Sequence, residues 1–139
     1  MNGWIGVDLD GTLAHYDGWK GPTHIGAPVP AMLERVKRWL AEGREVRIFT
    51  ARAWPFLVAV PEPNGWRKLQ VLPEIDIRQQ NDTIEALAAI AEWCERHLGR
   101  ALTITCVKDY GMVELWDDRA VQVIPNTGEP VGKSTRGLE

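Results

Sequence analysis

The sequence predicts an α/β fold with a parallel sheet. Short apolar segments of strand length alternate with longer segments in which apolar residues recur at helical spacing. This alternation is typical of strand–helix–strand units, which form parallel sheets with right-handed crossovers. With 139 residues, the chain is long enough for one domain, which would bury roughly 68–70% of the surface of its unfolded state. We expect this domain to cover residues 1–126 and a polar tail to cover residues 127–139.

The first strand is predicted from the apolar run that starts at Trp4, and it ends in two carboxylates. Residues 14–27 contain glycine, proline, tryptophan and histidine without a clear period, which predicts a short flap. A helix is predicted after Pro30, with apolar residues on one face and basic residues on the other. Gly43 would end this helix, at a position where glycine is favoured.

Another helix and four more strands are predicted after Gly43. A strand is expected over residues 45–50, and the prolines of residues 53–80 predict an insertion outside the core. Asp82 and Glu85 have the spacing of a capping box, so a helix is predicted to start there and to end at Gly99. Its inward residues would be Ile84, Leu87, Ala88, Ala91, Cys94 and Leu98. The remaining strands are expected over residues 102–106, 112–116 and 121–124.

Composition excludes several classes of function. The formal net charge of −3 argues against an extended nucleic-acid or membrane-surface footprint, although it is compatible with a small nucleotide as substrate. No apolar run approaches the length of a membrane span, so we expect no membrane partner. Cys94 and Cys106 lie in apolar segments and are interpreted as buried free thiols of a cytoplasmic protein.

The first strand ends in the most informative segment, in which Asp8 and Asp10 are followed by Gly11 and Thr12. Side chains two residues apart point to the same side of an extended chain, so these carboxylates can converge. Gly11 permits a sharp turn, and the Thr12 hydroxyl can hold a carboxylate. A surface turn is the simpler alternative, but the acids are embedded in apolar sequence. A calcium loop is excluded, because it needs glycine where this chain has Leu13.

Polar side chains also follow the next predicted strands. Thr50 ends the second strand, Lys108 follows the third, and Asp117 and Asp118 end the fourth. Because ligands bind at the carboxyl ends of parallel strands, we expect these groups to meet at one edge of the sheet. Carboxylates offer the hard oxygen ligands that suit Mg²⁺, and a metal, a lysine and a hydroxyl together suit a phosphate group.

This set of groups predicts a mechanism for breaking a phosphate ester. Asp8 would attack phosphorus and form an aspartyl-phosphate. Asp10 would protonate the leaving oxygen and afterwards deprotonate the attacking water.

These segments, in this order, resemble the four motifs of the haloacid dehalogenase (HAD) superfamily of phosphohydrolases. The motifs are Asp8-Leu9-Asp10-Gly11-Thr12, Thr50, Lys108 and Asp117-Asp118. The resemblance implies a magnesium-dependent phosphatase on a three-layer Rossmann-like parallel sheet with strand order 3-2-1-4-5. The flap and the insertion are too short for a full cap domain, so the resemblance is to the small uncapped (C0-like) type.

The resemblance also implies roles for individual residues. Asp8 would be the nucleophile and Asp10 the general acid/base. Magnesium would be held by Asp8, by the backbone carbonyl of Asp10 and by the acidic pair, in which Asp118 contacts the metal more directly than Asp117. The expected catalytic residues are Asp8, Asp10, Thr50 and Lys108.

Further residues near the expected site have alternative interpretations. Arg52 and Thr12 are candidate substrate-binding residues, although Arg52 could equally pair with a carboxylate. Arg119 is interpreted as a member of a structural ion pair. Three tryptophans in the flap and the insertion could stack on a substrate ring, but packing is the favoured interpretation. They are Trp19, Trp54 and Trp66.

The substrate is not fixed by these patterns. A nucleotide, a nucleic-acid end and a phosphorylated small molecule all fit, and an uncapped domain with tryptophan-rich segments could form a homodimer. Two alternatives to a phosphatase stay open: a phosphotransferase that uses the same intermediate, and a regulatory module that binds metal without turnover.

Overall fold

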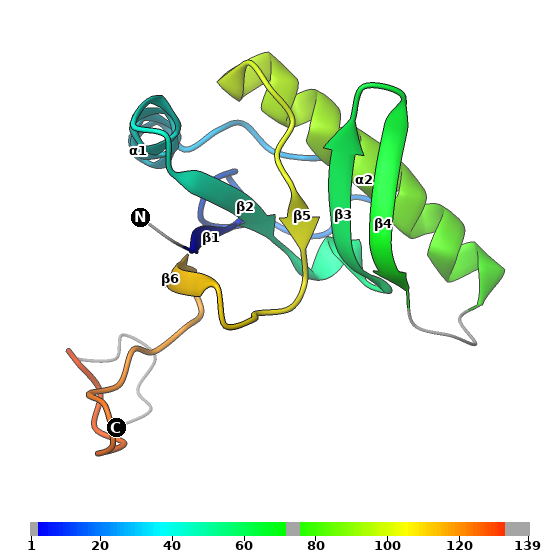
Figure 1. The fold of residues 1–139 in the computed structure, drawn as a ribbon. Helices are drawn as coiled ribbons and strands as arrows, with labels where there is room; N and C mark the ends of the chain where they lie inside the picture. Colours follow the sequence, from blue (N-terminus) through cyan, green and yellow to red (C-terminus); the bar gives the residue numbers. More distant parts are fainter. Residues whose placement is uncertain (1–2, 72–75, 133–139) are drawn as a thin grey trace.

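The computed structural model describes residues 3–71 and 76–132, which form a mixed α/β fold with a six-stranded open sheet (Figure 1). The strand order is β4-β3-β5-β2-β1-β6. Four strands are parallel to one another, and the hairpin β3–β4 extends the sheet in antiparallel orientation. The strands are β1 (Trp4–Asp8), β2 (Glu45–Phe49), β3 (Phe56–Glu62), β4 (Gly65–Val71), β5 (Ile104–Thr105) and β6 (Met112–Trp116).

Both helices of the described chain, α1 (Pro30–Ala41) and α2 (Ile77–Leu98), pack on the same face of the sheet. Ile5 and Val7 of β1 belong to one buried cluster with residues of α1 and α2. Residues 106–111 return from β5 to β6 without a helix, so no helix of the described residues covers the opposite face. The expected three-layer arrangement is therefore wrong for the part of the chain that the structure describes.

The four parallel strands lie in the order β5-β2-β1-β6, which is the order 3-2-1-4 expected for the first four predicted strands, but the expected fifth strand is missing from the described residues. Residues 121–124 do not form the expected fifth strand, and Val123 makes only an isolated antiparallel bridge to Pro130. Val121 and Ile124 are exposed, because no second layer buries them. The segment folds back on itself instead. The expected polar tail begins in this folded segment, and its residues 133–139 lie outside the described residues.

The segment predicted as an insertion outside the core contributes to the sheet. Val58 and Ala59 of β3 pair with the two residues of β5. Ala53, Phe56 and Ala59 are buried in the core, so that part of the prediction is wrong. The prolines of this segment had indicated a loop, but proline is also accommodated near the end of a strand. Pro61, for example, lies next to the last residue of β3.

The second helix starts earlier than predicted. Asp76 is its N-cap, and the carboxylate of Asp76 accepts a hydrogen bond of 2.7 Å from the backbone N–H of Arg78. Asp82 therefore lies inside α2 and does not cap it. The buried face is also rotated from the predicted one, since Ile84 is exposed and Thr83 is buried. Leu87 and Cys94 point inward as predicted; Ala88 is exposed, and Ala91 and Leu98 are partly buried. The helix ends at Gly99 in a left-handed conformation, as expected.

The register of the parallel strands brings several strand ends to one place. Asp8 pairs with Phe49 of β2, and Val7 pairs with Trp116 of β6. The residues that follow β2 and β6, Thr50 and Asp117, therefore lie beside the end of β1. Two further observations concern the whole described chain. None of its helices combines the length and apolar character needed to cross a bilayer, and Cys94 and Cys106 are both free thiols.

Candidate functional site

Three carboxylates gather where β1 and β6 end. Oxygen atoms of Asp8, Asp117 and Asp118 lie within 4.8 Å of one another. Asp8 is the last residue of β1, and the acidic pair follows β6 directly. The structure therefore brings together residues that are more than a hundred positions apart in the chain, as the predicted parallel sheet requires.

The turn after β1 shapes one side of this cluster. Gly11 has a φ of +92°, and a Cβ atom at this position would lie 2.6 Å from Oδ2 of Asp118. Only glycine combines this backbone conformation with such a close approach. The hydroxyl of Thr12 donates a long hydrogen bond of 3.4 Å to Oδ1 of Asp118. This contact agrees with the expectation that Thr12 holds a carboxylate, and its role as a substrate-binding residue stays a prediction.

Crowding of these acids changes the ionisation of Asp8. Its pKa is raised to about 7, first by burial, then by a hydrogen bond with Asp118 and by the negative charges of Asp117, Asp118 and Asp10. A carboxyl group with this pKa is held in surroundings that disfavour its charge. A cation at the cluster would reverse that effect.

The donor set fits a hard divalent cation. All three side chains offer carboxylate oxygens, which suit Mg²⁺ or Ca²⁺ and not the softer transition metals. Mg²⁺ retains several waters when proteins bind it, and the exposed position of Asp118 gives water access to the cluster. The role of the Asp10 carbonyl as a further ligand, and the preference for Asp118 over Asp117, stay predictions.

The side chain of Asp10 is engaged elsewhere, by Arg52. Nε and Nη2 of Arg52 donate to the two oxygens of Asp10 at 2.8 Å and 2.9 Å, which is a bidentate ion pair. Nη1 donates at 3.1 Å to the carbonyl of Pro22 in the flap, and the ring of Trp19 lies 4.8 Å from the guanidinium carbon. The Arg52 side chain is only 6% exposed. Arg52 thus ties the flap to Asp10.

Thr50 directly follows β2 and is the N-cap of a short 3₁₀ turn, Ala51–Ala53. It is 3% exposed, and its Oγ1 caps the turn by accepting a hydrogen bond of 3.1 Å from the backbone N–H of Arg52. This cap leaves the hydroxyl proton of Thr50 available to a ligand. The same turn projects the Arg52 side chain toward Asp10, so one local structure positions both residues.

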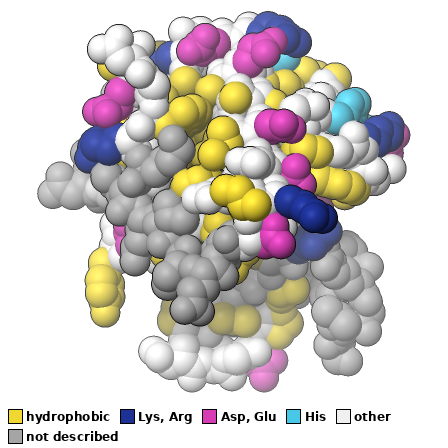
Figure 2. Space-filling model, turned by 90° about the vertical axis from the view of Figure 1, so that its right-hand side faces the viewer, with side chains coloured by type: hydrophobic (Ala, Val, Ile, Leu, Met, Phe, Trp, Pro, Cys, Tyr) yellow, Lys and Arg dark blue, Asp and Glu magenta, His cyan; other side chains and the backbone are white. Residues whose placement is uncertain are grey.

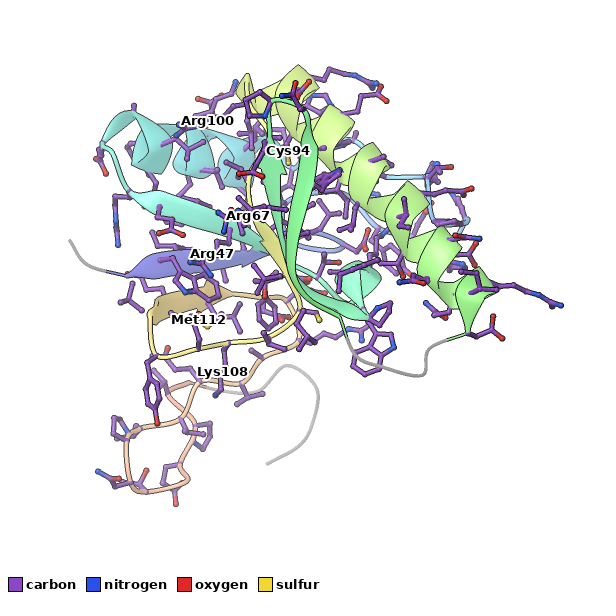
Figure 3. The ribbon with its side chains drawn as sticks, turned by 45° about the vertical axis from the view of Figure 1, so that its right-hand side comes forward. Arg47, Arg67, Cys94, Arg100, Lys108 and Met112 are labelled. Carbon is purple, nitrogen blue, oxygen red and sulfur yellow. The ribbon has the colours of Figure 1, made fainter. Side chains whose placement is uncertain are left out.

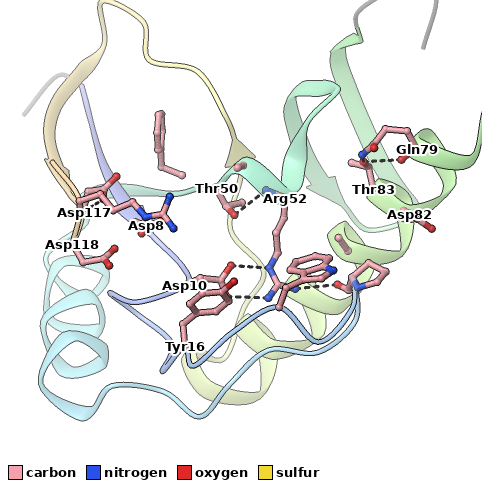
Figure 4. Close-up of a pocket in the computed structure, with 16 residues that line it drawn as sticks. Asp8, Asp10, Tyr16, Thr50, Arg52, Gln79, Asp82, Thr83, Asp117 and Asp118 are labelled. Atoms are coloured by element: carbon pink, nitrogen blue, oxygen red, sulfur yellow. Dashed lines mark hydrogen bonds and ion pairs between the residues drawn. The ribbon is translucent and has the colours of Figure 1, made fainter. Parts of the chain in front are cut away.

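These groups line one side of a cavity of about 630 Å³ (Figure 4). The cavity continues past Asp10 and Arg52 to the first turns of α2. Its other walls come from the flap and from α2. They include Tyr16, Trp19, Pro22, Gln79, Asp82, Thr83 and Ala86.

Lys108 is not brought to this cavity. It is exposed and lies on the loop that joins β5 to β6 (Figure 3), where it lines a second hollow with Asp109, Tyr110 and Met112. Two basic residues of the described chain line the first cavity instead: Arg52, which is paired with Asp10, and Arg119, which follows the acidic pair in the chain. The backbone N–H of Arg119 donates at 2.7 Å to Asp117. Arg119 was expected only in a structural ion pair.

The sequence interpretation missed the residues of α2 that line the cavity. Gln79, Asp82 and Thr83 lie on the helix at spacings that place them on one side. Their spacing could have indicated a shared side of the helix, but only if the helix had been predicted to start before Gln79. Trp54 and Trp66 do not line the cavity, whereas Trp19 does.

Comparisons of the chain with protein-family models, with curated proteins and with solved structures find no match.

Proposed function

We propose that this protein is a Mg²⁺-dependent phosphatase that hydrolyses a phosphomonoester through a phosphorylated Asp8. The observation that carries the proposal is the gathering of Asp8, Asp117 and Asp118 within 4.8 Å, at the edge of a cavity that also contains Thr50 and Asp10. An acidic site repels a phosphate by itself, so a bound cation is part of the proposal. When bound, Mg²⁺ would supply positive charge to the phosphate oxygens.

The first chemical step transfers the phosphoryl group to the protein. A carboxylate oxygen of Asp8 forms a bond to phosphorus while the bond from phosphorus to the leaving oxygen breaks. In its protonated form, Asp10 gives its proton to that leaving oxygen, which departs as an alcohol. A carboxyl group has about four lone-pair positions, and Arg52 uses one on each oxygen of Asp10. Arg52 therefore orients Asp10 without occupying every position.

The second step returns the protein to its starting state. Asp10 takes a proton from a water molecule, whose oxygen bonds to phosphorus as the bond from phosphorus to Asp8 breaks. Inorganic phosphate leaves, and Asp10 carries the proton for the next cycle. The Thr50 hydroxyl and the Arg119 guanidinium, both from residues that line the cavity, would donate hydrogen bonds to the phosphate oxygens during both steps.

The test is phosphate release from a panel of phosphomonoesters, with Mg²⁺ and with EDTA. We expect release to require Mg²⁺ and to be lost in Asp8→Asn. The matched control is Asp17→Asn, which removes an exposed flap carboxylate paired with Lys20 at 3.0 Å and outside the cavity. Acid quenching during turnover should trap a phosphoprotein that is cleaved by hydroxylamine, as acyl phosphates are. Unchanged release by Asp8→Asn would refute the mechanism.

A further inference from the structure

We infer that the preferred substrate is a small phosphomonoester whose leaving group bears no second anionic group. The inference rests on the proposed function and adds a substrate class to it. It follows from the size of the cavity, the charges that line it and the side chains at the end remote from the acidic cluster.

The cavity has the size of a small-molecule site. Its volume of about 630 Å³ lies within the roughly 300–1,000 Å³ of typical ligand pockets. The reacting phosphate would occupy the end at Asp8, where the nucleophile lies. The leaving group would then extend past Asp10 and Arg52 toward Gln79 and Asp82 of α2 (Figure 4).

The charge of the lining is strongly asymmetric. Among the described residues, the acidic side chains that line the cavity are Asp8, Asp10, Asp82, Asp117 and Asp118, and the basic ones are Arg52 and Arg119. Arg119 lies at the acidic cluster, beside the position proposed for the reacting phosphate. Arg52 is paired with Asp10 and bonded to the Pro22 carbonyl, and it is nearly buried. Neither arginine is therefore available to a second anionic group on the leaving group.

The remote end offers acceptors and aromatic rings. Asp82 is exposed and presents a carboxylate, and Gln79 adds an amide. Trp19 is 60% exposed and Tyr16 is 40% exposed, and both line the cavity. A carboxylate and aromatic faces suit hydroxyl, amino or ammonium groups and disfavour a phosphate or a carboxylate.

The same charges disfavour a nucleic-acid end. Polynucleotide binding needs basic side chains along the backbone of the strand. On the face shown in Figure 2, lysine and arginine side chains are dispersed among acidic and apolar ones and do not form a stripe. A polyanion would meet Asp82 where its second phosphate lies.

The experiment compares kcat/KM for Mg²⁺-loaded protein on matched pairs of esters that differ in the charge of the leaving group. The pairs are phosphoethanolamine against phosphoglycolate, glycerol phosphate against phosphoglycerate, and glucose phosphate against phosphogluconate. We expect the uncharged or cationic member to be favoured about tenfold at low ionic strength, and the ratio to shrink as salt screens the charges. A preference for the anionic members would overturn the inference.

Substitution on α2 identifies the cause of the preference. Asp82→Asn should lower the ratio severalfold, because it removes the charge at the remote end. Glu85→Gln, one turn further along the helix and outside the cavity lining, should leave the ratio unchanged. An unchanged ratio in Asp82→Asn would also overturn the inference.

A binding measurement separates this inference from the proposed function. Calorimetric titration of Mg²⁺-loaded Asp8→Asn with the same pairs needs no turnover. If no ester is hydrolysed but the uncharged members bind more tightly, the phosphatase proposal fails and the ligand class stands. If esters are hydrolysed and the anionic members bind more tightly, the ligand class fails and the phosphatase stands.

Discussion

Arg52 holds both carboxylate oxygens of Asp10, with its Nε 2.8 Å from one oxygen and its Nη2 2.9 Å from the other. The pair is largely shielded from water, since the two side chains are 6% and 20% exposed. A planar guanidinium fixes the plane of a carboxylate, which a lysine cannot do. The remaining contacts of Arg52 reach Pro22 and Trp19, so the orientation of Asp10 depends on the closed flap.

The first prediction concerns this pair. Arg52→Gln should lower kcat by about 10- to 100-fold, because a general acid must be held in its productive geometry. Arg52→Lys should recover part of the loss, since it keeps the charge without the two parallel hydrogen bonds. Mg²⁺ affinity, measured by calorimetry, should change little in both variants because Arg52 does not touch the three-carboxylate cluster. An unchanged kcat in Arg52→Gln would contradict a positioning role.

A second prediction tests the close approach of Gly11 to Asp118. Gly11→Ala would place a Cβ atom 2.6 Å from the Asp118 carboxylate. Displacement of that carboxylate should weaken Mg²⁺ binding by about tenfold or more, as loss of ligand orientation does in metal sites. Gly18→Ala is the matched control, because Gly18 also has a positive φ of +128° but nothing lies within 4 Å of the added atom. Equal Mg²⁺ affinities in the two variants would contradict the prediction.

The sequence predicted the order of the four parallel strands and the edge at which they end, but it did not predict the antiparallel hairpin β3–β4. Asp8, Thr50 and Asp117 could be placed together because parallel strands end at one edge, and this inference needs only the strand order near β1. The hairpin β3–β4 could not be anticipated, because its prolines are compatible with strands only at positions that depend on the neighbouring strand. The strand propensity of a segment does not tell which strand will lie next to it in the sheet.

The contacts between distant loops were also beyond prediction. Arg52 had two interpretations, a substrate contact or an ion pair with a carboxylate. The choice of Asp10 as partner depends on the 3₁₀ turn after Thr50 and on the path of the flap. The start of α2 was misplaced because Asp76 and Asp82 both have acceptable cap chemistry, and in the structure it is the Asp76 carboxylate that caps the helix by accepting from the backbone N–H of Arg78.

The third prediction is a pH dependence of Mg²⁺ binding. The pKa of Asp8 is raised to about 7 in the metal-free protein, so the protonated form predominates below that pH. Binding of the cation must displace this proton, and apparent affinity should fall about tenfold for each pH unit below 7. The Asp8→Asn variant has no proton to displace at residue 8, so its Mg²⁺ affinity should depend much less on pH. Calorimetry at pH values on both sides of the pKa measures the Mg²⁺ affinity. An affinity that does not change with pH in the unmodified protein would contradict the prediction.

A fourth prediction compares two basic residues. Arg119 lines the cavity beside the acids, whereas Lys108 lines the other hollow. Arg119→Ala should therefore lower kcat/KM by about 10- to 100-fold, as loss of a charged donor to a phosphate does. Lys108→Ala should change it by less than about threefold, because its side chain lies outside the cavity. The reverse order would show that the β5–β6 loop rearranges when substrate binds.

The last prediction concerns the closure of the flap at its base. The backbone N–H of His15 donates to the Ala27 carbonyl at 2.8 Å, and Nε1 of Trp93 donates to the Gly26 carbonyl at 2.9 Å. A Cβ atom at Gly26 would lie 2.0 Å from the His15 carbonyl oxygen, so Gly26→Ala must move the backbone at residue 26 away from His15. We expect a loss of about 1–3 kcal/mol in the free energy of unfolding and a faster exchange of the His15 amide hydrogen. Gly132→Ala, where the added atom meets nothing within 4 Å, is the control. Because Arg52 bonds to the flap at Pro22, Gly26→Ala should also lower kcat. Unchanged stability and unchanged kcat in this variant would show that the position of the flap does not depend on the close approach of Gly26 to His15.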